Sequence, residues 1–145
     1  MLIELMASDD ILGEAYAWLC HRRRDYPANA DIWSFRRNWD TEHKRLKGDL
    51  LTNSFRFDAL ERVGLKDGSM VDVWTSRDAL VLKAMNICLA QVLPVSPHCT
   101  HIKGHGGAKA AIRQVAENLP RHGFVLRTDV KSYYASIDHH LLLDR

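Results

Sequence analysis

The sequence has few cysteines, no long hydrophobic run and little net charge. Its three cysteines, Cys20, Cys88 and Cys99, are odd in number and widely spaced. They argue against a disulfide framework and favour a reducing compartment. No apolar run approaches the roughly 20 residues that a membrane-spanning helix needs, and the start of the chain lacks the basic segment of a secretory signal. We therefore expect a cytoplasmic protein without a membrane partner.

The composition is that of an ordinary globular chain. Of the 145 residues, 46% are hydrophobic and 26% are charged, which excludes a disordered chain. The net charge of +2 is unevenly placed, because residues 101–145 carry seven basic and four acidic side chains. Glu117 is the only acid between His101 and Thr128. A local basic surface would suit a phosphate-rich partner.

The spacing of apolar residues predicts a mainly helical α+β chain with one small antiparallel hairpin. Helices are expected at about 9–23, 31–50, 76–93 and 108–118, with Ser8 and Ser76 as N-caps of the first and third. Short strands at 55–57, 60–63 and 70–74 flank a turn at 66–69. A further strand, 124–128, follows the breaks at Pro120 and Gly123.

Two segments allow both a structural and a nucleic-acid-binding interpretation. One face of the helix predicted at 31–50 is basic: Arg36, Arg37, Lys44, Arg45 and Lys47. It is either a solvated face or a surface along a nucleic-acid backbone. The glycine-rich turn 104–107 either opens a helix or offers free N–H groups to an anion at the helix N-terminus. Lys103, Lys109 and Arg113 lie close to that turn.

The segment Phe124-Val-Leu-Arg-Thr-Asp129-Val-Lys-Ser-Tyr-Tyr134-Ala-Ser-Ile-Asp-His139 is the most informative one. It predicts a buried strand that delivers the carboxylate of Asp129 onto a turn followed by two aromatic residues. A carboxylate at a strand end is exposed enough to bind a hard cation and is held at a fixed height. Alternatively, Asp129 is a turn residue and Tyr133 and Tyr134 belong to a core.

This segment resembles the first catalytic motif of reverse transcriptases, most closely those of group II introns and related bacterial elements. The resemblance implies RNA-templated addition of deoxynucleotides to a 3′-hydroxyl with two Mg²⁺ ions. Asp129 would bridge both ions, and the backbone carbonyl of Val130 would complete the site. Tyr134, with Tyr133 beside it, would contact the incoming nucleotide and exclude a 2′-hydroxyl. Ile137 would return to the core, and Asp138 would cap a helix that starts at His139.

The resemblance extends upstream. Residues 75–85 resemble the stretch that opens a fingers helix in group II enzymes, and residues 101–112 resemble their glycine-rich motif, with Lys103 at an arginine position. Ser69 stands where these enzymes place an arginine, which Lys66 or Arg62 could replace, and Trp74 stands at a proline position. The resemblance implies a single partial domain, 1–145, with fingers at 1–120 and the start of a palm at 121–145. Its nucleic-acid contacts would be Lys103, Lys109, Arg113, Arg127 and Lys131.

A polymerase palm also needs a downstream aspartate pair, which this sequence does not supply. We therefore expect the isolated chain not to polymerise, although its partners would be an RNA template, a DNA primer and deoxynucleotide triphosphates. A second chain could supply the rest of the palm and the thumb. The alternatives are an RNA-binding module without catalysis and a structural or regulatory protein. A zinc site is not expected, because the cluster His98, Cys99, His101 and His105 has no second ligand pair.

Overall fold

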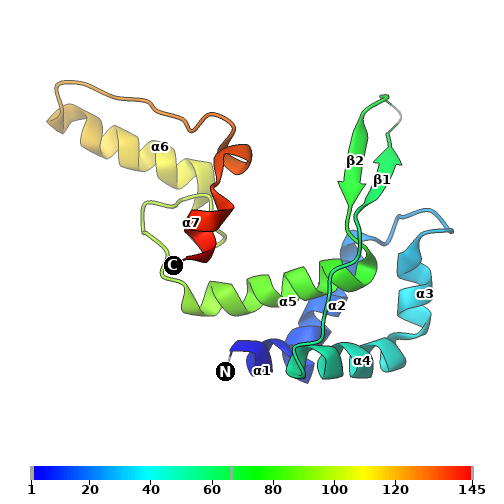
Figure 1. Cartoon of the computed structure of the whole chain (residues 1–145). Coiled ribbons are helices and arrows are strands. Elements are labelled where there is room, and N and C mark those ends of the chain that lie inside the picture. The colour runs from blue at the N-terminus through cyan, green and yellow to red at the C-terminus, as the bar shows by residue number, and fades with distance from the viewer. Residues whose placement is uncertain (1, 66, 145) are drawn as a thin grey trace. The chain divides into compact units, whose positions relative to one another are not determined.

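The computed structural model describes residues 2–65 and 67–144, and the chain forms two compact units, residues 1–94 and 95–145. The first unit contains α1 (Leu2–Met6), α2 (Asp9–Arg22), α3 (Asp31–Arg37), α4 (Trp39–Leu51), β1 (Glu61–Gly64), β2 (Met70–Val73) and α5 (Ser76–Val92) (Figure 1). The second contains α6 (Gly107–Asn118), α7 (His139–Leu143) and two 3₁₀ turns, Leu119–Arg121 and Tyr133–Ser136. The predicted mainly helical class with one small antiparallel hairpin is confirmed. No described helix is both long and apolar enough to cross a membrane.

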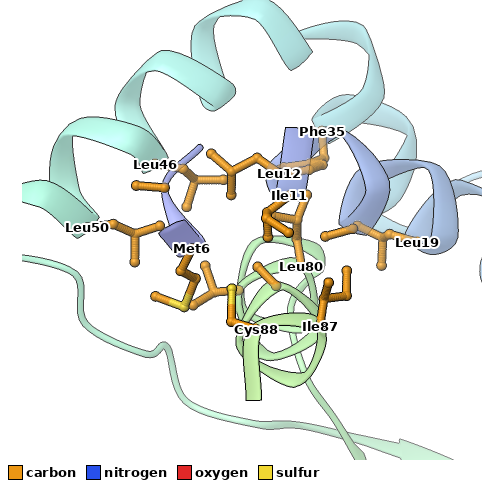
Figure 2. Packing of buried hydrophobic residues seen from close by; sticks show 14 of the residues in the cluster. Met6, Ile11, Leu12, Leu19, Phe35, Leu46, Leu50, Leu80, Ile87 and Cys88 are labelled. Carbon is orange, nitrogen blue, oxygen red and sulfur yellow. The ribbon is translucent and has the colours of Figure 1, made fainter. Parts of the chain in front are cut away.

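The hydrophobic core of the first unit lies between its helices. Helix α5 packs against α1, α2 and α3, so most of its circumference is covered. Figure 2 shows the core side chains of these helices and of α4 converging. The fully buried apolar residues are Leu12, Ala15, Leu19, Ile32, Leu46, Leu80, Ala84 and Cys88. Cys88 is one of these residues, and burial raises the pKa of its thiol.

The first predicted helix is confirmed with its cap. Helix α2 begins at Asp9, and the Oγ of Ser8 accepts a hydrogen bond from the N–H of Ile11 at 3.4 Å. Asp9 and Asp10 occupy the first turn, where negative charge is favourable. The hydrogen bond from Lys47 lowers the pKa of Asp9, and this pair links α2 to α4. The short helix α1, before Ser8, was not predicted.

The predicted helix at 31–50 is wrong as one continuous element, because the chain turns at Asn38. There α3 ends and α4 begins, and the Nδ2 of Asn38 donates to the carbonyl of Ser34 at 3.0 Å. The break lets both halves reach the same core, Ile32 from α3 and Leu46 from α4. A straight helix could direct only one end towards it.

The hairpin is shorter than the sequence predicts. β1 pairs antiparallel with β2, from Glu61 opposite Val73 to Gly64 opposite Met70 (Figure 1). Residues 55–57 form no strand, so that prediction is wrong. Instead, Phe55 packs partly against the helical core. An isolated two-stranded hairpin is only marginally stable, so its base needs an anchor.

That anchor is the buried guanidinium of Arg23, at the end of α2. Its Nη2 donates to the carbonyl of Trp74 at 2.7 Å, where the hairpin ends. Its Nη1 donates to the Oγ of Ser76 at 2.9 Å and to the Oδ1 of Asp31 at 3.2 Å. Asp31 also accepts from the Oγ of Ser76 at 2.8 Å and from its N–H. One cation therefore joins the ends of α2, α3, β2 and α5.

Ser76 is not the N-cap that the sequence predicted for α5. The cap is Thr75, whose Oγ1 accepts from the N–H of Asp78 at 3.2 Å. Ser76 lies one position inside the helix and is buried. Its hydroxyl is used by Asp31 and Arg23 instead. Serine is by type a slightly better cap than threonine, so the tertiary contact of Ser76 decides between the two adjacent hydroxyl residues.

Replacing Arg23 with methionine is expected to lower the free energy of unfolding by about 2 kcal/mol. The variant keeps an apolar stem but leaves the Trp74 carbonyl without its Arg23 donor, and it leaves the Asp31 carboxylate with the Ser76 donors but no cation. Urea denaturation followed by circular dichroism measures the loss. The matched control is Arg24→Met, because Arg24 is exposed and pairs only with its neighbour Asp25. Equal midpoints for the two variants would contradict the anchoring role.

Candidate nucleic-acid interface

The strand predicted at 124–128 does not form. Residues 124–130 have no regular secondary structure, and β1 with β2 makes up the only sheet among the described residues. Phe124 is 86% exposed and Leu126 is 80% exposed. A single segment cannot satisfy the backbone groups of a strand without a neighbour. The apolar pattern of this segment is present, but no partner covers it within the second unit.

Asp129 lies in this irregular segment and is exposed. Its Oδ1 accepts the N–H of Val130 at 2.9 Å, a local bond within the turn. Within residues 2–65 and 67–144, no three His, Cys, Asp or Glu side chains come together as a possible metal site. One carboxylate and one carbonyl are fewer ligands than two Mg²⁺ ions need. The described residues therefore do not fit a two-metal centre by themselves.

The two tyrosines follow a sharp backbone turn. Ser132 adopts a left-handed conformation (φ 52°), after which Tyr133–Ser136 forms a 3₁₀ turn. The Oγ of Ser136 closes it by donating to the carbonyl of Tyr133 at 2.9 Å. The rings of Tyr133 and Tyr134 meet edge to face with centroids 5.2 Å apart, and Tyr134 is 85% exposed. The alternative that both are core aromatics is wrong, and their contact with a nucleotide stays a prediction.

The cap predicted after the motif is confirmed. The Oδ1 of Asp138 accepts from the N–H of His140 at 2.9 Å and from that of Leu141 at 3.3 Å. Helix α7 then begins at His139. Ile137, predicted to return to a core, is half-buried in the second unit. The motif thus ends as the sequence predicts, although its first half is not a strand.

The glycine-rich turn does open α6, at Gly107. Gly104, Gly106 and Gly107 all have positive φ, and Gly106 (φ 81°) is the N-cap. The N–H of Gly107 donates to the carbonyl of Thr100 at 2.9 Å. One of the amides expected to be free for an anion is therefore used inside the loop. The helix-entry interpretation is confirmed, and anion binding stays a prediction.

The predicted nucleic-acid contacts of the second unit are all exposed cations: Lys103, Lys109, Arg113, Arg127 and Lys131. None has an ion-pair partner in the part of the chain that the structure describes. Lys109 and Arg113 are one helical turn apart on α6. Ile112, Val115 and Leu119 form an exposed apolar stripe on the same segment. The helix therefore offers both uncompensated charge and unburied apolar surface.

In the first unit, the predicted fingers motif has a structural role that the sequence did not reveal. Arg77 donates to Asp49 Oδ2 at 2.8 Å, and its guanidinium lies 4.4 Å from the ring centre of Phe55. Asp78 is fully buried and accepts the N–H of Asp58 at 2.9 Å. These contacts tie the segment between α4 and the hairpin to α5. No local sequence signal identifies such long-range partners.

Among the described residues of the hairpin, Arg62 is not free to replace the arginine missing at Ser69. Asp67 accepts from the N–H and Oγ of Ser69 at 3.0 and 2.6 Å, and these bonds lower the pKa of Asp67. Arg62 makes bonds of 2.8 and 3.2 Å to Asp72, so its guanidinium is already engaged. Lys66 lies outside the described residues.

Among the described residues of the second unit, no three side chains of the cluster His98, Cys99, His101 and His105 converge. The chain matches no protein-family model, no curated protein and no solved structure. The argument for a function therefore depends on the residues themselves and on the resemblance that their order carries.

Replacing Gly106 with alanine is expected to destabilise α6. A Cβ at this position would lie 2.7 Å from the Cβ of Ala110, and the left-handed backbone adds strain. The overpacking costs about 1 to 2 kcal/mol beyond that strain. Hydrogen exchange read by mass spectrometry should therefore show faster exchange in 107–118. Gly104→Ala is the matched control, since it has a positive φ but open space around it. Equal exchange in both variants would refute the packing argument.

Proposed function

We propose that the chain is the nucleic-acid-binding, N-terminal part of a group II-like reverse transcriptase. Asp129 would be one of the carboxylates of RNA-templated DNA synthesis, and Tyr134 the residue that excludes ribonucleotides. The single observation that carries the proposal is the ordered segment 124–139. The upstream motifs at 75–85 and 101–112 support it, because they occur in the order that the family requires.

The catalytic part of the proposal needs a second contributor. Asp129 is exposed and is not joined by other acidic ligands among the described residues. Its polymerase role therefore requires further carboxylates, together with strands beside 124–128. A second chain that supplies the rest of the palm and the thumb would provide both. The segment that contains Phe124 and Leu126 is almost fully exposed at both residues, so strands of such a partner could pair with it.

The function that the chain performs by itself is then RNA binding. Three basic residues lie close together in the sequence around the N-terminal half of α6: Lys103, Lys109 and Arg113. None has an acidic partner within the described residues. Uncompensated lysines and arginines bind phosphates and release counterions. An RNA–DNA heteroduplex, the form of a template paired with its primer, is the expected ligand.

Neutralising Lys109 and Arg113 with glutamine should weaken binding of a blunt RNA–DNA heteroduplex about tenfold at low salt. It should also reduce the magnitude of the slope of log K against log salt by up to about two. Each lost phosphate contact contributes about 0.9 to that slope for B-form duplexes. Fluorescence anisotropy across a salt series measures both. Arg24→Gln with Arg56→Gln is the control, because both are exposed arginines of the first unit. A flat plot for the unaltered chain would contradict phosphate binding.

The purified chain should incorporate no deoxynucleotide on a poly-A/oligo-dT template with Mg²⁺. Co-expression with the remaining palm and thumb of a group II-like enzyme should restore incorporation, and Asp129→Asn should abolish it. Asp144→Asn is the matched control, because Asp144 is an exposed carboxylate outside the motif. Incorporation by the purified chain alone, or full activity of Asp129→Asn in the complemented enzyme, would refute the assignment.

A further inference from the structure

Two adjacent hollows on the first unit share a floor of aromatic side chains. One has a volume of about 450 Å³ and the other about 370 Å³. Trp18 from α2, Trp74 from the base of the hairpin and Ala79 from α5 line both. We call this surface the tryptophan groove. It lies entirely within residues 1–94 and involves none of the residues assigned to the Asp129 motif.

The aromatic rings of the groove are open to solvent. Trp18 is 38% exposed, Trp74 is 40% exposed, and Tyr26 at one end is 40% exposed. The two other tryptophans are engaged elsewhere: Trp39 stacks on Tyr16 at 3.8 Å, and Trp33 donates to the carbonyl of Pro27. The exposed rings are not needed to fill the core. The ring of Trp74 contacts that of Phe57 with centroids 5.7 Å apart, and the guanidinium of Arg23 lies 5.3 Å from the ring centre of Tyr26. The exposed part of each ring offers a flat face to a ligand.

The charges beside these rings favour an anionic ligand. Arg22 lines the first hollow and Lys83 lines the second, and neither has an acidic partner in the described residues. The one acid of the groove, Asp72, is held by Arg62 at 2.8 and 3.2 Å. Lys83 Nζ lies 5.6 Å from the ring centre of Trp18. Its flexible stem lets the ammonium group move to a phosphate.

We propose that the tryptophan groove binds unpaired nucleotides of single-stranded RNA. Bases stack on Trp18 and Trp74, and Arg22 and Lys83 contact the flanking phosphates. Aromatic faces beside uncompensated cations are how proteins hold single strands without reading their sequence. Trp74 is a position where the chain departs from the group II pattern. The groove therefore does not depend on the proposed polymerase role.

The test compares a short oligouridylate with an abasic oligonucleotide of the same length. Both carry the same phosphates, but only the first has bases to stack. We expect the full chain to bind the oligouridylate at least tenfold more tightly, with quenching of tryptophan emission. Trp18→Ala with Trp74→Ala should remove that preference. Trp18→Phe with Trp74→Phe should keep much of the binding but lose most of the quenching.

The controls distinguish base stacking from an effect on folding and from phosphate binding by the cations of α6. Val92→Ala removes an exposed apolar side chain of α5 outside the groove and should change nothing. Lys83→Ala should weaken oligouridylate binding and reduce its salt slope by about 0.7. Heteroduplex binding should persist in the tryptophan variants, because the duplex has no unpaired bases. Each of three results would overturn the proposal. They are equal affinity for the two oligonucleotides, unchanged oligouridylate binding by the double alanine variant, and quenching of tryptophan emission by a proline-rich peptide but not by the oligouridylate.

Discussion

The buried guanidinium of Arg23 is the interaction on which the first unit depends. A buried charge is costly unless it is paired and hydrogen-bonded, and Arg23 donates three hydrogen bonds, to Asp31, Ser76 and the Trp74 carbonyl. Ser76 and Trp74 lie more than 50 residues from Arg23 in the sequence, whereas Asp31 is eight residues away. The bond to Trp74 fixes the base of a hairpin that would be marginal alone. It also fixes one wall of the tryptophan groove, so the anchor and the proposed RNA site share a residue.

The fingers-like motif at 75–78 shows how one short segment can carry both a resemblance and a structural role. Thr75 caps α5, Arg77 contacts Asp49 and Phe55, and Asp78 holds the backbone of Asp58. All of these contacts are within the first unit. The residues that give the motif its recognisable order are therefore those that close the helical core around the hairpin. Substituting them is therefore expected to destabilise the unit as well as to change any contact with nucleic acid.

Most helices could be predicted from the sequence because their signals are local. Ser8 and Asp138 cap helices where the pattern predicts caps, and the apolar spacing predicts the helices that bury Leu12, Leu19 and Leu80. The errors arise where a distant partner decides. Asn38 breaks a helix so that both halves meet one core, and Ser76 loses the capping role because Asp31 takes its hydroxyl. The sequence did not indicate that Arg23 is buried, because a buried arginine and an exposed one differ only in the acceptors that the fold brings to them.

The strand expected at 124–128 does not form, for a related reason. Its absence separates the two proposed functions, RNA binding and catalysis. The alternation of its apolar residues leads to a strand only where a neighbouring strand can pair with it. The described residues of the second unit provide no such neighbour. A catalytic carboxylate must be held in place before substrate arrives, because reorganisation during the reaction is costly. Asp129, which lies on an irregular segment and accepts a hydrogen bond from the N–H of Val130, lacks that support. Phosphate binding by exposed cations and stacking on Trp18 and Trp74 require no such sheet. The proposed RNA binding therefore does not require a palm, whereas the proposed catalysis does.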